Sequence, residues 1–244
     1  MRNIQLRLPT LCVLALAVVG LSSTSAAAGI ITVPPGLAPG SQYRLVFNTV
    51  NVFTATSSNI ADYNTDVNTE ADSIAALAAL GTTWTAIAST ESVNAITNIG
   101  SDPGVPIYGL NGTEVVSDAT TGSKGLFSGS LLAPILFSET GVDETGRGDW
   151  TGTSPTGVAN ATHALGDSAP VIGLIGDANG TWIDDLTFPA GTGFPLYGIS
   201  GVLTVPSAAP EPATTMMLIL GGALMIGARR RMSPRKNRAT RTLC

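Results

Sequence analysis

The clearest periodic pattern along the chain lies in residues 59–80, where apolar side chains recur every three or four positions. This spacing is typical of an amphipathic helix that buries one face. Asn59 suits the N-cap of that helix and Gly81 its C-cap, because these residue types are favoured there. A second, shorter helix is expected over residues 91–99, before Gly100. The apolar positions of the longer helix are Ile60, Tyr63, Val67, Ala71, Ile74 and Leu77 or Ala78.

The other apolar segments are short and rich in β-branched or aromatic residues, which predicts strands. The first expected strand covers residues 43–49, and a hairpin is expected over residues 106–116, around the turn 109–112. Two early helices followed by short antiparallel strands predict an α+β fold in one exported domain, residues 41–206. The remaining strands are expected at residues 84–88, 133–137, 149–152, 171–175 and 195–205.

The N-terminus has the pattern of a secretory signal peptide. Arg2 and Arg7 precede an apolar run over residues 11–21, and small residues follow it. The run is short for a bilayer span, and a buried core helix is the alternative interpretation. We therefore expect signal peptidase to remove residues 1–28, and residues 29–40, which are rich in proline and glycine, to form a linker.

The C-terminus combines three unlike features in a fixed order. A stiff, proline-containing linker over residues 207–212 comes first. Residues 213–228 are mostly apolar and predict a transmembrane helix, about 24 Å long at 1.5 Å per residue. A cluster of arginines follows, and the positive-inside rule keeps such a cluster cytoplasmic. The residues that define the linker and the cluster are Pro210, Glu211, Pro212, Arg229, Arg230 and Arg231.

This order resembles the PEP-CTERM sorting signal of proteins that are exported by Gram-negative bacteria making exopolysaccharide. The resemblance covers residues 210–231 and implies recognition by an exosortase, a membrane cysteine protease that cuts near the Pro-Glu-Pro. It implies an inner-membrane-anchored precursor that is later moved to the cell surface or the extracellular matrix. Residues 232–244 depart from the pattern, and their basic composition predicts a disordered cytoplasmic tail. A plain C-terminal membrane anchor is the alternative.

Several short segments of the middle region resemble a group of secreted bacterial proteins whose domain is C-type-lectin-like and akin to endostatin. The resemblance implies a C-type-lectin-like fold for residues 41–206 and carries no ligand, because the function of that group is mostly uncharacterised. Related domains often have cysteines near the last strands, and this chain has none there. The segments that carry the resemblance are residues 84–89, 105–116, 129–135, 150–153 and 196–199.

Charge separates a strongly acidic body from two basic ends. Residues 29–210 hold three basic and sixteen acidic residues, a net charge of −13, against −5 for the whole chain. An acidic body argues against nucleic-acid binding, which needs basic residues on the folded surface. With two cysteines and one histidine in 244 residues, a disulfide scaffold and a Cys/His zinc site are also excluded.

Catalytic patterns are absent from the sequence. His163 is the only histidine, and no spacing places a nucleophile and an orienting partner beside it. There is no phosphate-binding loop, dinucleotide fingerprint or metalloprotease motif. The acidic stretch of Asp143, Glu144 and Asp149 around Arg147 is expected to be a solvated loop. We expect a protein that is not an enzyme, with a hydrolase as the distant alternative.

One acidic loop carries the oxygen ligands that calcium prefers. Asp177, Asn179, Asp184 and Asp185 lie within nine residues, and loop backbones add carbonyl oxygens. Trp182 shortly before Asp184 resembles the arrangement that helps to hold calcium in sugar-binding C-type lectins. The sequence therefore makes a calcium site possible here, and an acidic surface turn is the alternative.

Two functions of different class agree with these patterns. In the first, the body is a non-catalytic binding module for exopolysaccharide, in which exposed Trp150, Trp182 and Tyr197 stack on sugar rings. In the second, it is a purely structural or adhesive surface protein that its acidic, Thr/Ser/Gly-rich exterior keeps solvated. An acidic body repels an anionic polymer, so we expect calcium to be needed if the polysaccharide is acidic.

Overall fold

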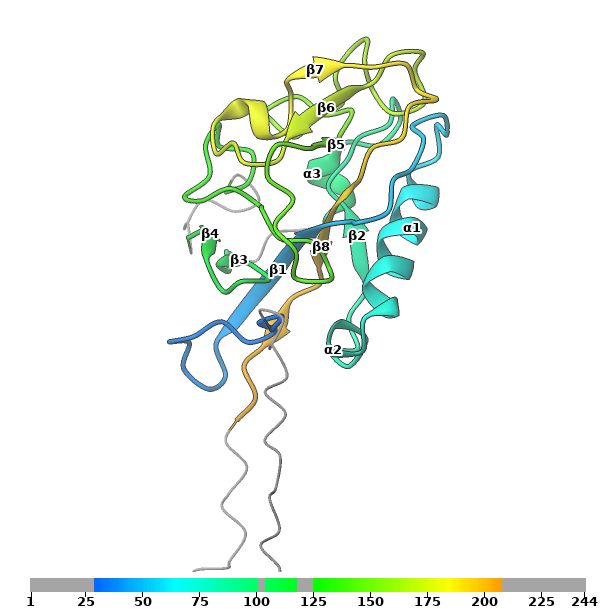
Figure 1. Ribbon diagram of the computed structural model, residues 1–244. Coiled ribbons are helices and arrows are strands. Elements are labelled where there is room, and N and C mark those ends of the chain that lie inside the picture. The colour runs from blue at the N-terminus through cyan, green and yellow to red at the C-terminus, as the bar shows by residue number, and fades with distance from the viewer. Residues whose placement is uncertain (1–28, 101–103, 118–124, 208–244) are drawn as a thin grey trace, which may run out of the picture.

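The computed structural model describes residues 29–100, 104–117 and 125–207, and a mixed six-stranded sheet is its largest element (Figure 1). The strands of this sheet are β1 (Gln42–Asn48), β2 (Trp84–Ala86), β3 (Ile107–Gly109), β4 (Glu114–Val116), β8 (Tyr197–Ser200) and β9 (Leu203–Thr204). Their order is β2-β8-β1-β3-β4, and β9 pairs with the first residues of β1. β1 is parallel to β3 and antiparallel to β8, so both of its edges are hydrogen-bonded.

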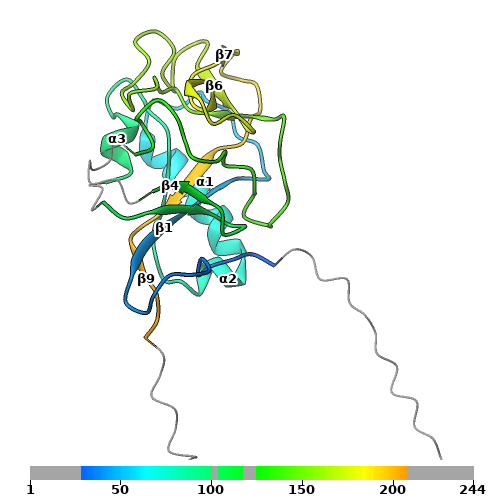
Figure 2. The ribbon, with the colours of Figure 1, turned by 90° about the vertical axis from the view of Figure 1, so that its left-hand side faces the viewer.

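A smaller antiparallel sheet lies at the end of the molecule opposite the two described chain ends (Figures 1 and 2). It consists of β5 (Gly148–Trp150), β6 (Val171–Leu174) and β7 (Leu186–Thr187). A short 3-10 helix, η2 (Gly180–Trp182), lies between β6 and β7 in the chain. The strands expected over 149–152 and 171–175 are confirmed as β5 and β6.

The longest helix, α1 (Ile60–Ser73), covers one face of the central sheet with its apolar side. Asn59 is its N-cap, as predicted, and the Asn59 side chain accepts a hydrogen bond of 3.2 Å from the amide of Ala61. The expected helix over 59–80 is interrupted at Ile74, which is extended, before the single turn α2 (Ala75–Ala78). β-branched isoleucine is a weaker helix former than its alanine neighbours, in agreement with a break at that position.

The predicted α+β, C-type-lectin-like fold with two early helices and antiparallel strands is wrong. The described residues are mostly sheet with few helices, and the pairing of β1 with β3 is parallel. The second expected helix, 91–99, is reduced to the single turn α3 (Ala95–Asn98). Thr90 and Val93 hydrogen-bond to each other's backbones at 3.0 and 3.2 Å, which holds the chain before α3 out of a helical conformation.

The terminal segments lie outside the described residues. They comprise the segments predicted to be a signal peptide (1–28), a sorting segment with a Pro-Glu-Pro and an arginine cluster, a transmembrane helix (213–228) and a basic tail (232–244). Within the described part of the chain, no helix is long and apolar enough to cross a bilayer.

The hairpin predicted over residues 106–116 is confirmed. β3 and β4 pair with Ile107 opposite Val116 and Tyr108 opposite Glu114. The amide of Gly112 donates to the carbonyl of Gly109 at 2.9 Å, and Gly112 has a φ of +78°, which favours glycine. The strand expected over 133–137 is absent from the strands of the described chain and is represented there by isolated bridges at Phe137 and Ser138.

The two faces of β1 support two separate hydrophobic clusters. Phe47 points to the α1 face, where its ring lies 5.1 Å from that of Trp84. Val46 points to the other face and packs in the cluster that contains Tyr197 and Trp182. Successive side chains of a strand point to opposite faces, and the burial of both faces explains why Tyr43 to Asn48 are all buried.

We predict that Gly173→Ala strongly destabilises the protein. Gly173 lies in β6, and an added Cβ would lie only 1.8 Å from the backbone oxygen of Trp182, which cannot move without shifting η2. Such overpacking costs about 1–3 kcal/mol and lowers Tm by roughly 4–10 °C in a domain of this size. Thermal unfolding followed by circular dichroism measures the effect. Gly191→Ala is the control, since nothing lies within 4 Å of its added Cβ, and an equal loss in both variants would contradict the packing explanation.

Candidate functional site

The three aromatic residues predicted to stack on sugars are buried. Trp150 is 0% exposed, and Trp182 and Tyr197 are each 1% exposed. The indole N–H of Trp150 donates to the carbonyl of Phe53 at 2.9 Å, and the rings of Trp182 and Tyr197 lie 5.6 Å apart. The prediction of exposed binding platforms is therefore wrong, because these large rings are used to fill the hydrophobic clusters.

The predicted calcium ligands do not assemble into a metal site. The Asp177 carboxylate and the Asn179 side-chain oxygen both accept from the Thr181 hydroxyl, and Asn179 also caps η2. Asp184 accepts from the side chain of Asn160 at 3.3 Å. In the described chain, no three His, Cys, Asp or Glu residues, Asp185 included, lie where they could hold a metal ion. The Asp177 and Asn179 oxygens are engaged in the local turn at η2, and Asp184 is engaged by the more distant Asn160.

His163 has a structural partner. Its Nδ1 lies 2.7 Å from the carbonyl oxygen of Ala169, and its own carbonyl accepts from the amide of Val171 at 2.9 Å. Both interactions hold the turn that precedes β6. The imidazole is therefore tied to the backbone of its own loop rather than aligned with a nucleophile, as a general base would have to be.

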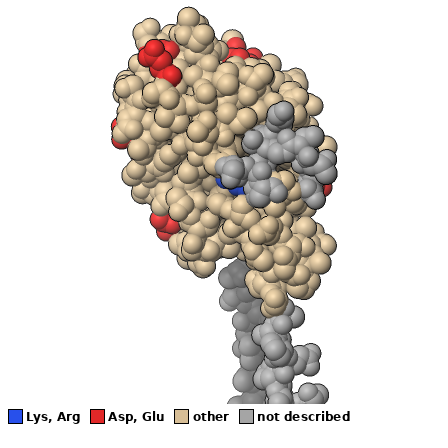
Figure 3. Space-filling model, turned by 180° about the vertical axis from the view of Figure 1, so that it is seen from behind, with Lys and Arg blue, Asp and Glu red and all other residues tan. Residues whose placement is uncertain are grey.

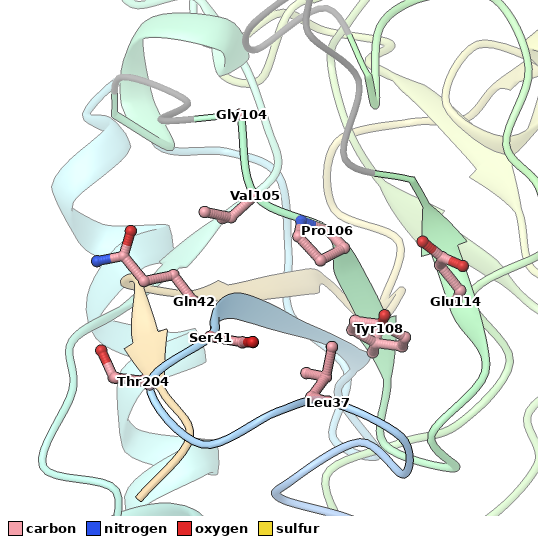
Figure 4. Close-up of a pocket in the computed structure, with 10 residues that line it drawn as sticks. Leu37, Ser41, Gln42, Gly104, Val105, Pro106, Tyr108, Glu114 and Thr204 are labelled. Atoms are coloured by element: carbon pink, nitrogen blue, oxygen red, sulfur yellow. The ribbon is translucent and has the colours of Figure 1, made fainter. Parts of the chain in front are cut away.

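A pocket with a volume of about 660 Å³ lies beside the first residues of β1 (Figure 4). We call it the basal pocket. Its volume falls within the range of typical small-ligand sites. Residues 104–106 form one wall with no charged side chain. The side chains that give the pocket its chemistry are Leu37, Ser41, Gln42, Tyr108, Glu114 and Thr204.

Three segments that are distant in sequence build the basal pocket: residues 37–42, residues 104–114 and Thr204. Gln42 at the start of β1 pairs with Thr204 of β9, and the amide of Arg44 donates to Pro106 at 3.0 Å. The carbonyl of Val205 accepts from Gly40 at 3.0 Å. Backbone hydrogen bonds to both edges of β1 thus hold the walls in place, so the pocket does not need to be ordered by a ligand.

The lining combines one aromatic ring, one carboxylate, one amide and two hydroxyls. Tyr108 is half-buried, and burial, together with the negative charge of Glu114, raises its pKa above the ordinary value. The phenol therefore stays protonated at neutral pH and can donate a hydrogen bond. Leu37 and the Ser41 hydroxyl point toward Tyr108 in Figure 4. An aromatic face beside several hydrogen-bonding groups can hold a sugar ring, which has apolar faces and a polar edge.

The acidic stretch predicted to be a solvated loop is only partly solvated. Asp143 is exposed, and Arg147 forms an ion pair of 2.5 Å with Glu144. Asp149 lies in β5 and is 0% exposed, and neither of its carboxyl oxygens has a hydrogen-bond partner among the described residues. Burial raises the pKa of Asp149 well above its usual range, against the opposing effect of Arg147. The solvated-loop prediction is therefore wrong for Asp149, because β5 carries it into the interior.

Glu139 is a second buried carboxyl group, and the sequence did not single it out. Both of its carboxylate oxygens accept from the amide of Val50, at 3.2 and 3.0 Å. Burial nevertheless raises the pKa of Glu139 to about 7. Since Glu139 and Asp149 are enclosed, they are unsuited to contact a ligand, and their effect is on stability.

We predict that the folded state loses stability as the pH rises from about 5 to about 8. Unfolded Glu139 ionises near the ordinary value of 4.5, whereas folded Glu139 ionises at about 7. Its contribution to stability is therefore fully present below the ordinary pKa and is lost as the pH passes through about 7. The expected loss is about 1–3 kcal/mol in the free energy of unfolding. Urea unfolding at several pH values measures it.

Glu139→Gln should flatten this pH dependence, because glutamine has no charge to bury. Glu91→Gln is the matched control, since Glu91 is exposed and its removal should leave the slope unchanged. A Glu139→Gln variant with the full pH dependence would show that other groups cause it.

No protein-family model matches this chain, and no curated protein is significantly similar to it. The resemblance of residues 210–231 to a PEP-CTERM signal therefore stays a prediction. The candidate site likewise stands on its own residues, above all on Tyr108 and Glu114. The predicted hairpin brings these two residues near each other, but the register shift that sets Tyr108 opposite Glu114 is seen only in the structure. No local signal brings Leu37 or Thr204 to the same pocket.

Proposed function

We propose that this protein is an exported, non-catalytic glycan-binding protein of the cell surface or extracellular matrix. The observation that carries the proposal is the basal pocket, where Tyr108, Glu114, Gln42 and two hydroxyls surround a preformed hollow. The ligand we propose for it is a sugar unit of exopolysaccharide. The sequence predicted that Trp150, Trp182 and Tyr197 stack on sugar rings, but these residues are buried. In this proposal Tyr108 stacks on the sugar instead, because it is the one aromatic ring among the described lining residues.

The location of the pocket is compatible with this role. Thr204 of the lining lies three residues before Ser207, the last described residue, and Leu37 lies in the linker at the other chain end. Both described ends lie in the lower half of the view in Figure 1, away from the smaller sheet. A bound glycan would therefore lie close in the chain to Ser207, the last residue that the structure describes.

A purely structural or adhesive surface protein is the second candidate. It is favoured by the burial of all three tryptophans and by a surface whose acidic groups are scattered (Figure 3). In that case the pocket would bind no sugar, and the protein would act through its bulk and solvation alone. A direct binding measurement separates the two candidates.

We predict that Tyr108→Leu weakens glycan binding about five- to tenfold, because leucine keeps the apolar packing but removes the ring face and the phenol. Isothermal titration of the purified protein with defined neutral, amino and acidic oligosaccharides measures this. Phe188→Leu is the control, since Phe188 is also half-buried and directly follows β7, at the far end of the molecule. If no oligosaccharide binds, the structural candidate replaces the glycan-binding one.

We also propose, from the resemblance, that signal peptidase and an exosortase process the chain. The mature protein is then expected to lack the first ~28 residues and the segment after about Glu211. Mass spectrometry of the exported material should show no peptide from Met216 onward. Recovery of peptides containing Arg229 from the extracellular fraction would contradict this processing, and a full-length chain in the membrane fraction would favour a plain anchor.

A further inference from the structure

The basal pocket has one charged side chain among its described lining residues, the carboxylate of Glu114. Within the described part of the chain, no hydrogen bond or ion pair engages that carboxylate. Glu114 is directly opposite Tyr108 in the β3–β4 hairpin, and directly opposed residues of a pair have neighbouring side chains. The effect of the Glu114 charge on the pKa of Tyr108 agrees with this proximity. One negative charge therefore stands beside the one aromatic ring.

The described basic residues are engaged elsewhere. Arg44 is buried and donates to the carbonyls of Ser200 and Ile99 at 2.7 and 2.9 Å. Arg147 pairs with Glu144. Basic groups are visible at only one small point on the face shown in Figure 3, and residues 29–210 carry a net charge of −13. The body thus carries an overall negative charge, which favours the approach of cations.

We propose that the basal pocket selects glycans that carry free amino groups, with the sugar ammonium paired to Glu114 and the ring against Tyr108. This rests on the proposed glycan-binding function and adds the class of ligand to it. A carboxylate and an ammonium form a charge-assisted hydrogen bond, which is stronger than a neutral one. An aromatic face also attracts an ammonium group. An acidic polymer is disfavoured, because it meets a carboxylate in the pocket and a like-charged surface around it.

The test compares three tetrasaccharides of equal length: one of glucosamine with free amines, its fully N-acetylated counterpart, and one of galacturonic acid. Titration calorimetry with the purified protein, in mildly acidic buffer that keeps the amines protonated, gives each affinity. We expect the amine form to bind about tenfold more tightly than the acetylated form, and the acidic form not to bind. Short ligands are used because a long polycation would bind any acidic surface.

Glu114→Gln should reduce the preference for the amine form to about twofold or less, while the acetylated form keeps its affinity. Glu91→Gln removes the same charge from an exposed position that does not line the pocket, and it should leave the preference intact. If Glu91→Gln lowers the preference as much as Glu114→Gln, diffuse charge explains the selectivity and the inference is wrong.

The inference and the function on which it rests fail in different ways. If the acetylated or the acidic tetrasaccharide binds as tightly as the amine form, and Tyr108→Leu weakens that binding, the pocket binds glycans but does not select amines. If none of the three binds, the glycan-binding proposal falls together with the inference. Tight binding of the amine form that Glu114→Gln abolishes supports both.

Discussion

The two-sided hydrogen bonding of β1 is the constraint on which the rest of the structure depends. With β3 on one edge and β8 and β9 on the other, the polar backbone groups of β1 are paired, and the strand can pass through the interior. Its beginning at Gln42 forms a wall of the basal pocket. Its end at Asn48 is bonded to the backbone of Glu139, whose carboxylate meets the next turn. The basal pocket and the buried acid thus lie at opposite ends of one strand.

The carboxyl groups of this protein differ in how well their environment tolerates a negative charge. Glu139 and Asp149 are enclosed, so ionisation is disfavoured and they lower stability at high pH. Glu114 lies at a pocket open to solvent, where a charge can be hydrated and remains available to a ligand. The aromatic residues divide in a similar way: Trp150 and Trp182 are fully buried in the clusters, whereas Tyr108 is half-buried, packs against one cluster and lines the basal pocket.

Much of the local structure could be predicted. The strand at 43–49, the start of the helix at Asn59 and the hairpin over 106–116 all depend on residues close in sequence, through periodicity, capping and turn geometry. The helix predicted over 91–99 was wrong because Thr90 and Val93 hydrogen-bond to each other's backbones, which periodicity alone does not reveal. The fold class was wrong because it depended on pairings between strands that are distant in sequence, such as β1 with β3. The exposure of Trp150 could not be read locally either, since its partners are Phe53 and Phe194.

The sequence by itself determined the acidic body between basic ends, the lack of cysteine in that body and the main local elements. Only the tertiary structure decided which polar residues are buried and which line the basal pocket. Asp149 and Glu114 are both carboxylic acids, but Asp149 lies in β5 and is buried, whereas Glu114 lies in β4 and lines the pocket. The pocket itself needs the pairing of Gln42 with Thr204, which are 162 positions apart. Such a long-range pairing cannot be predicted from the hydrophobic pattern around either residue.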